Sequence, residues 1–180
     1  MKVRALFVVT AMMAVSLLAS AQKMAKESEG SEAKMQKEVR HELNMLAYVT
    51  AFDYMVFKVD GRNITLLGQV TRPSLKADAE AAVKHVEGVE HVDNQIEVLP
   101  PSSQDDAIRI RLFRAIYGYP QLQKYELGTT KPIRILVKSG HVTLAGIVDN
   151  EGDKNIAGLR AKTVPGTFSV DNQLQVVTGS

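Results

Sequence analysis

Three carboxylates at alternate positions have the spacing in this chain that comes nearest to a metal site. Asp149, Glu151 and Asp153 follow the ligand order that opens an EF-hand calcium loop. Such a loop needs a glycine at its sixth position and a bidentate glutamate at its twelfth, but Lys154 and Arg160 occupy these positions. Acidic residues also stabilise the first turn of a helix, because they complement its dipole. We therefore expect these three acids to begin a helix rather than to bind calcium.

The other residues capable of acid–base or metal chemistry lack the partners that such chemistry needs. The four histidines are never spaced as H-x-H or H-x(3)-H, and the chain has no cysteine. Nucleophile-elbow, P-loop and dinucleotide-binding glycine motifs are absent from the sequence. The tripeptide Asp-Asn-Gln occurs at 93–95 and 171–173, where a final strand begins, which favours turns and backbone hydrogen bonds. The sequence therefore predicts no catalytic residue, no metal, no cofactor and no enzymatic activity.

The charge balance argues against one class of partner. The chain has 22 Lys and Arg residues against 20 Asp and Glu residues, which gives a net charge of +2. Nucleic-acid binding through phosphate neutralisation needs a marked positive excess, so we expect no nucleic-acid partner. With 45% apolar residues, 180 residues suffice for one packed domain or two small ones.

The first 21 residues have the pattern of a secretory signal peptide. Lys2 and Arg4 form a short basic segment, residues 5–18 are an uncharged apolar run, and residues 19–21 (Ala-Ser-Ala) form a cleavage site. The apolar run is shorter than the roughly 20 residues that span a bilayer, which favours export with cleavage after Ala21 over an uncleaved anchor. Cleavage leaves 20 basic and 20 acidic side chains. Residues 22–35 are polar and predict a flexible leader.

An internal duplication organises the rest of the chain. Residues 59–99 align without a gap to residues 137–177, and 15 of the 41 aligned positions are identical. Chance gives about two or three identities over such a window, so the chain carries two copies of one unit. Residues 100–104 (Pro-Pro-Ser-Ser-Gln) predict a short linker. This division sets a first domain at 36–99 and a second at 105–178.

Hydrophobic periodicity gives both copies the same order of elements. A helical apolar stripe comes first, in residues 39–47 and 108–116, and two alternating apolar runs joined by a tight turn then predict a hairpin. A second helix and a closing strand follow, and Gly68 and Gly146 are expected to let that helix pack close to the sheet. The order predicts an α+β fold of two small αββαβ sandwiches, each a three-stranded sheet covered on one face by two helices.

The sequence of each copy resembles the BON domain, a bacterial module of exported and envelope proteins. The pattern V-x-V-x(3–4)-V/I-x-L-x-G-x-V leads to an alanine-containing helix, then to Gly-Val and V-x-N-x-I/L-x-V. The matching residues are Gly68, Gly88, Val89, Val92, Asn94, Ile96 and Val98, and then Gly146, Gly166, Val170, Asn172, Leu174 and Val176. The second copy departs from the pattern at Thr167 and in the extra stretch 128–132. The resemblance implies a non-enzymatic periplasmic protein, associated with phospholipid surfaces, envelope integrity or osmotic stress.

The opening helix of the second copy supplies residues for such an association. Besides its core stripe it carries a second apolar stripe of Ile110, Phe113 and Tyr117, flanked by Arg109 and Arg114. A helix with two apolar faces must bury both of them. We expect this stripe to enter an anionic phospholipid membrane, with the two arginines on its head groups. The alternatives are burial against the first domain or the following loop, and pairing with another chain or an envelope protein as an adaptor.

Overall fold

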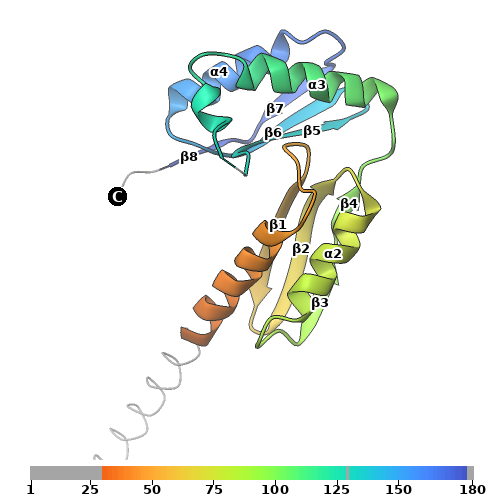
Figure 1. Ribbon diagram of the computed structural model, residues 1–180, viewed down its shortest axis with the longest axis vertical. Helices are drawn as coiled ribbons and strands as arrows, with labels where there is room; N and C mark the ends of the chain where they lie inside the picture. Colours follow the sequence, from red (N-terminus) through yellow and green to blue (C-terminus); the bar gives the residue numbers. More distant parts are fainter. Residues whose placement is uncertain (1–29, 129, 178–180) are drawn as a thin grey trace, which may run out of the picture.

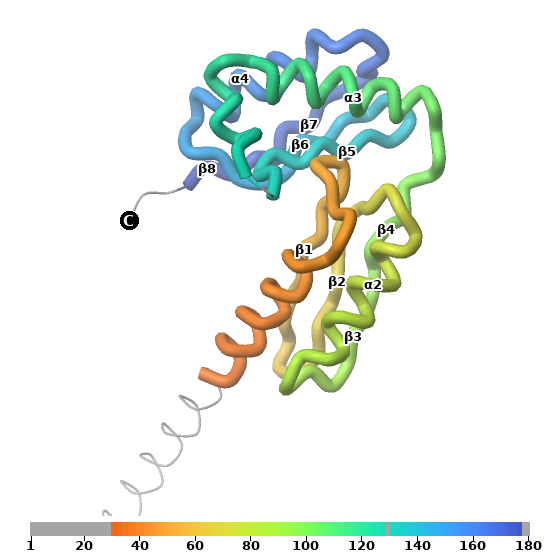
Figure 2. Tube along the Cα trace, viewed as in Figure 1, coloured from red at the N-terminus to blue at the C-terminus, as the bar shows by residue number. Residues whose placement is uncertain are grey.

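A computed structural model describes residues 30–128 and 130–177. The expected signal peptide and residues 22–29 of the expected leader lie outside these residues. Two α+β units follow one another along the chain, and Figure 1 shows the second above the first. The trace in Figure 2 follows the single connection that runs from the end of β4 up to α3.

The first domain packs two helices against one face of an open sheet. A helix of residues 30–45 comes first, and the elements after it are β1 (Tyr54–Asp60), β2 (Asn63–Val70), α2 (Pro73–Lys84), β3 (His91–Asn94) and β4 (Glu97–Val98). β1 and β2 form an antiparallel hairpin, while β3 and β4 both pair parallel to β2. The expected order of elements and the expected hairpin are confirmed.

The second domain repeats this arrangement. Its elements are α3 (Ser103–Tyr117), the 3-10 turn η1 (Gln123–Tyr125), β5 (Ile133–Lys138), β6 (His141–Val148), α4 (Glu151–Lys162), β7 (Ser169–Asn172) and β8 (Gln175–Val176). β5 and β6 form the hairpin, and β7 and β8 pair parallel to β6. In Figure 1, α3 and α4 cover one side of this sheet, and the first domain approaches from the other side. The predicted α+β fold of two sandwiches is therefore confirmed.

The closing strand of each copy is broken into two segments, so that each sheet gains a fourth short strand. An asparagine stands at each break. The side chain of Asn94 donates to the carbonyl of Lys76 at 2.8 Å and accepts from the amide of Ile96 at 3.2 Å. Asn172 makes the two equivalent bonds in the second copy. The backbone-bonding role predicted for the repeated tripeptide is confirmed, and it ties the second helix of each domain to the sheet.

Both domains begin earlier than the sequence pattern indicates. The polar composition of 22–35 predicts a flexible leader, but residues 30–35 are helical and Met35 is buried in the first core. Met35 extends the helical stripe by one turn, so these six residues belong to the first domain. In the same way α3 begins at Ser103, inside the expected linker.

Gly68 and Gly146 serve the hairpins rather than helix packing, contrary to the expectation from sequence. Their φ angles are +120° and +109°. A Cβ atom would lie 2.1 Å from the carbonyl oxygen of Tyr54 at Gly68, and 1.9 Å from that of Pro132 at Gly146. The backbone at the start of the neighbouring strand therefore excludes a side chain at both positions.

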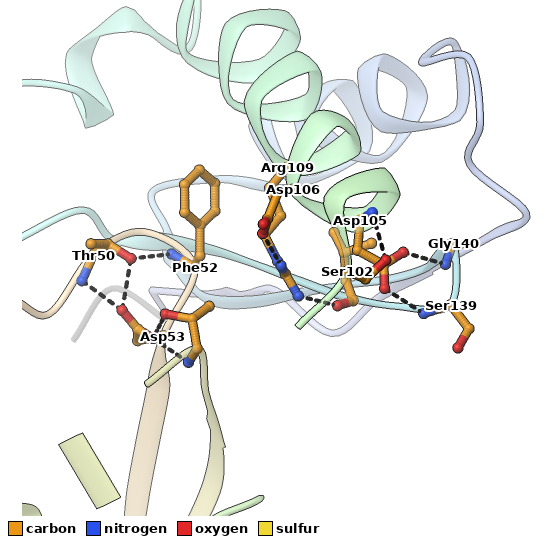
Figure 3. Close-up of polar contacts among 11 residues, drawn as sticks. Thr50, Phe52, Asp53, Ser102, Asp105, Asp106, Arg109, Ser139 and Gly140 are labelled. Carbon is orange, nitrogen blue, oxygen red and sulfur yellow. Dashed lines mark hydrogen bonds and ion pairs between the residues drawn. The ribbon is translucent and has the colours of Figure 1, made fainter. Parts of the chain in front are cut away.

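The first domain reaches the second through a turn at residues 50–53, which precedes β1 and is closed by a hydrogen bond from the amide of Asp53 to the carbonyl of Thr50. The carboxylate of Asp53 is buried and accepts hydrogen bonds from the backbone and hydroxyl groups of Thr50 and Thr71 (Figure 3). At the tip of this segment, the amide of Ile135 donates to the carbonyl of Ala51 at 2.7 Å. The segment thus lies against the outer edge of β5.

Candidate functional site

Helix α3 is fixed at its start to the turn between β5 and β6. The hydroxyl of Ser102 accepts from the amide of Asp105 at 3.1 Å and caps the helix. The buried carboxylate of Asp105 accepts from the amides of Ser139 and Gly140, both at 2.9 Å (Figure 3). The predicted core stripe is confirmed, because the following side chains are fully buried: Ile108, Leu112 and Ile116. These contacts set which faces of α3 meet the sheet and which meet solvent.

Arg109 faces the edge of β5 and is only 4% exposed. Its Nη2 donates to the carbonyl of Val137 at 2.6 Å, and its Nη1 donates to the carboxylate of Asp106 at 2.5 Å (Figure 3). The sequence predicts a head-group contact for this residue. In the structure both Nη atoms are instead bonded within the second domain, because α3 lies directly over the β5 edge, and the buried Nε has no hydrogen-bond partner among the described residues.

Tyr117 is also buried, at 1% exposed, and faces the same edge. Its hydroxyl donates to the carbonyl of Ile133 at 2.6 Å and accepts from the amide of Ile133 at 3.2 Å. Burial raises the pKa of Tyr117, so the hydroxyl stays protonated and keeps its donor. Tyr117 thus satisfies two backbone groups of the fold and does not form an exposed wedge.

Phe113 is half buried between the two domains. Its ring centroid lies 6.2 Å from that of Phe52, with the rings at 70°, and 4.7 Å from that of Tyr117. Phe52 belongs to the first-domain segment that meets β5, so Phe113 is placed as in the first alternative, burial against the first domain. The second apolar stripe of α3 is therefore divided, with Phe113 and Tyr117 packed inside the chain.

Ile110 and Arg114 are the two predicted site residues that remain accessible. Ile110 is 48% exposed, and Arg114 and its neighbour Arg111 are exposed on the same helix. On α4, in the same helical layer, Leu159 and Lys162 are exposed as well. We call these five residues the helical patch. It combines two apolar side chains with three cations.

Three residues of the helical patch are not predicted by sequence periodicity. Leu159 lies outside the apolar stripe of α4, and a single leucine off a stripe is common on protein surfaces. Arg111 and Lys162 lie among many other charged residues and have no distinguishing spacing. The available signal is the absence of any acid between Arg109 and Tyr117, which leaves this part of α3 basic.

The acids at the start of α4 have structural partners. Glu151 and Asp153 lie in the first turn of α4, as predicted. The Nζ atom of Lys124 lies 2.6 Å from a carboxylate oxygen of Asp149 and 2.8 Å from one of Asp153. The hydroxyl of Tyr125 donates to Asp153 at 2.6 Å. Within residues 30–128 and 130–177, no three potential metal-ligating side chains gather, and no helix is long and apolar enough to cross a membrane.

Comparison with known proteins decides the family. A family model described as the BON domain matches residues 31–100 and 121–178, which is more than two thirds of the chain. The chain belongs to the BON domain family. Both copies of the duplication are matched, so the tandem BON organisation inferred from the sequence is confirmed. The first match begins at residue 31, in agreement with a first BON domain that includes the helix of residues 30–45.

Two solved structures are similar to this BON protein over most of its length. One is the C-terminal domain of CdsD, described as the structural protein of the type III secretion system of Chlamydia trachomatis. It is 11% identical, has a TM-score of 0.28, and the match covers 79% of this chain and 96% of that one. Another CdsD structure is 10% identical with a TM-score of 0.28, over 80% and 92% of the two chains. A search of curated proteins found no match.

Proposed function

We propose that this tandem BON protein is a non-enzymatic binding module that associates with anionic phospholipid through its helical patch. The observation that carries the proposal is the exposure of Ile110 beside Arg111 and Arg114 on α3. An apolar side chain in this setting enters the acyl boundary, while the neighbouring cations pair with phosphate groups. Each cation near an anionic surface contributes about 1 kcal/mol, so the binding is peripheral and reversible.

We further propose that the protein is exported and acts at the periplasmic side of the envelope, in envelope maintenance or under osmotic stress. The support is the signal-peptide pattern of residues 1–21 together with membership of a family of envelope modules. Mass spectrometry of the protein from a periplasmic fraction is expected to find Gln22 as the first residue. Recovery of the intact N-terminus in the cytoplasm contradicts the proposal.

Vesicle flotation tests the lipid-binding role. Wild-type protein is expected to float with vesicles containing phosphatidylglycerol and not with vesicles of phosphatidylcholine alone. Ile110→Glu and Arg114→Glu are expected to reduce flotation several-fold, because one removes the inserting side chain and the other reverses a charge. Ile147→Glu is the matched control, since Ile147 is 52% exposed but lies on the sheet face opposite the helices.

Flotation of Ile110→Glu equal to that of the wild type contradicts the lipid-binding role of the patch. An adaptor role of the same patch, toward another chain or an envelope protein, predicts a different pattern. In that case the wild type does not float, and Ile110→Glu reduces the size of a lipid-free complex in light scattering.

A further inference from the structure

The two domains differ at the outer edges of their sheets, β1 in the first and β5 in the second. In an antiparallel hairpin, residues direct their backbone N–H and C=O groups alternately toward the paired strand and away from it. The pairs that close the turns, Asp60 with Asn63 and Lys138 with His141, fix which residues point away. These outward residues are Met55, Phe57 and Val59 in β1, and Ile133, Ile135 and Val137 in β5.

The edge of β5 is covered by contacts from within the chain. Its three outward residues bond, in chain order, to Tyr117, Ala51 and Arg109. Two of these covering residues come from α3, and one comes from the turn at residues 50–53 of the first domain. The side chains of the outward β5 residues are fully buried. This edge therefore offers no template for a further strand.

The edge of β1 lacks this cover within the described part of the chain. No residue that the structure describes makes a hydrogen bond to the outward backbone groups of Met55, Phe57 or Val59. The side chains of these three residues are only partly buried, in contrast to their counterparts in β5. The edge of β1 is thus open along most of the strand.

The first helix explains the difference between the two edges. Its buried stripe of Met35, Val39 and Leu43 occupies the positions of Ile108, Leu112 and Ile116 in α3. On this alignment, shorter or hydrophilic side chains replace the edge-covering face of α3: Gln36, Arg40 and Asn44 stand where α3 has Arg109, Phe113 and Tyr117. A groove remains between helix and strand, which we call the β1 groove, lined by Gln36, Arg40, Asn44, Met55, Phe57 and Val59.

We propose that the β1 groove binds an extended acidic segment of a partner protein, which joins the sheet as a strand beside β1. The second domain shows that the equivalent edge accepts a backbone partner. There the turn at residues 50–53 places the carbonyl of Ala51 on the amide of Ile135, which is the repeat counterpart of Phe57. Backbone hydrogen bonds of this kind supply affinity in strand addition, and neighbouring side chains supply specificity.

The positive charges around the β1 groove favour an acidic occupant. The guanidinium carbon of Arg40 lies 5.8 Å from the ring centroid of Phe57, at the middle of the open edge. Lys58, on the same strand, is exposed. Neither cation forms an ion pair with a carboxylate of residues 30–128 or 130–177. Phe57 and Lys58 are successive residues of β1, so their side chains point to opposite faces of the sheet. An acid of an added strand on the helix side is therefore placed to pair with Arg40, and an acid on the opposite side with Lys58.

A second copy of this chain is a poorer occupant. Two β1 strands paired about a two-fold axis at Phe57 bring both Arg40 side chains to the same seam. Like charges that face each other across a strand pair are destabilising. The same two cations favour a heterologous segment that carries acids.

Fluorescence anisotropy with two labelled octapeptides tests the proposal. The acidic probe is Thr-Val-Glu-Val-Thr-Glu-Val-Thr, whose two glutamates point to opposite faces of an added strand, and its matched control has lysine at both glutamate positions. The chain from residue 22 onward is expected to bind the acidic probe with a Kd at least tenfold lower than the control. Amide hydrogen exchange at Met55, Phe57 and Val59 is expected to slow in the complex, because these amides become paired.

Two variants separate edge pairing from other kinds of binding. Gln36→Arg combined with Asn44→Tyr introduces the side chains with which α3 covers the β5 edge, and it is expected to raise the Kd for the acidic probe at least tenfold. Arg40→Glu changes only an exposed side chain and is expected to reverse the preference between the two peptides. Ile110→Glu, which tests the helical patch, is expected to leave peptide binding unchanged.

Three results overturn the proposal. The first is the absence of binding to the acidic probe at millimolar concentration. The second is equal binding by the wild type and both groove variants. The third is a concentration-dependent dimer in sedimentation equilibrium that closes the β1 edge against itself.

Discussion

The contact between Tyr117 and Ile133 can be removed with almost no change of shape. Tyr117→Phe deletes one oxygen atom and keeps the ring that packs against Phe113. The lost hydroxyl serves two backbone groups of β5, the carbonyl at 2.6 Å and the amide at 3.2 Å. Both groups belong to a fully buried residue, so water does not readily replace the hydroxyl.

The expected cost follows from the two groups left without a partner. A buried donor or acceptor that loses its partner costs about 1–3 kcal/mol. The hydrogen bond to the carbonyl is short and the hydrogen bond from the amide is long, so we place the cost of the unpaired amide at the low end of this range. The sum is about 2–4 kcal/mol, a large part of the roughly 5–15 kcal/mol that stabilises a typical domain.

Urea denaturation followed by circular dichroism measures this loss, and amide exchange at Ile133 locates it in β5. Exchange is needed because two domains can unfold in separate transitions. Tyr119→Phe is the control, since Tyr119 is half buried and its hydroxyl makes no hydrogen bond to a described residue. A change below about 0.5 kcal/mol for Tyr117→Phe, or an equal loss for the control, refutes the role of the hydroxyl as an edge cover.

Two further predictions concern the second domain. Gly146→Ala is expected to destabilise by about 2 kcal/mol or more, because φ is +109° and the new Cβ meets the Pro132 carbonyl. In Gly61→Ala the Cβ position is open and only backbone strain remains, so its thermal midpoint is expected to fall less. Burial alone raises the pKa of Asp153, but hydrogen bonds from Lys124, Tyr125 and Gln121 outweigh it and hold that pKa below 3.8. The stability from this lowered pKa is complete above the unfolded value and is lost as pH falls through the folded one. Urea titrations from about pH 5 down to pH 2 are therefore expected to show that the free energy of unfolding falls more steeply for wild type than for Asp153→Asn. Parallel pH dependences of the two proteins contradict this role of Asp153.

Much of the fold follows from local patterns. The duplication is visible because 15 of 41 aligned positions are identical, and each hairpin is visible because apolar residues alternate around a tight turn. The breaks in the closing strands are not visible. They depend on the side chains of Asn94 and Asn172 meeting carbonyls of α2 and α4 that are 18 residues away in the sequence.

The candidate site shows what hydrophobic periodicity predicts about a helix and what it does not. Spacing of 100° per residue correctly puts Phe113 and Tyr117 on a face of α3 away from its core stripe. It does not say whether solvent, a membrane or a strand edge lies beside that face. In the structure β5 and Phe52 lie there, which leaves Ile110 and Arg114 accessible and turns Arg109 inward.

The sequence by itself determined the tandem BON architecture, the hairpins, the core stripes and the helical start at the acids of α4. These features depend on contacts between near neighbours in the chain, whose geometry the backbone period fixes. Only the tertiary structure decided that α3 and the first domain cover the edge of β5, while the first helix leaves the edge of β1 open. That difference depends on which side chains meet strands far away in the sequence, and the identity of such neighbours is set by packing rather than by period.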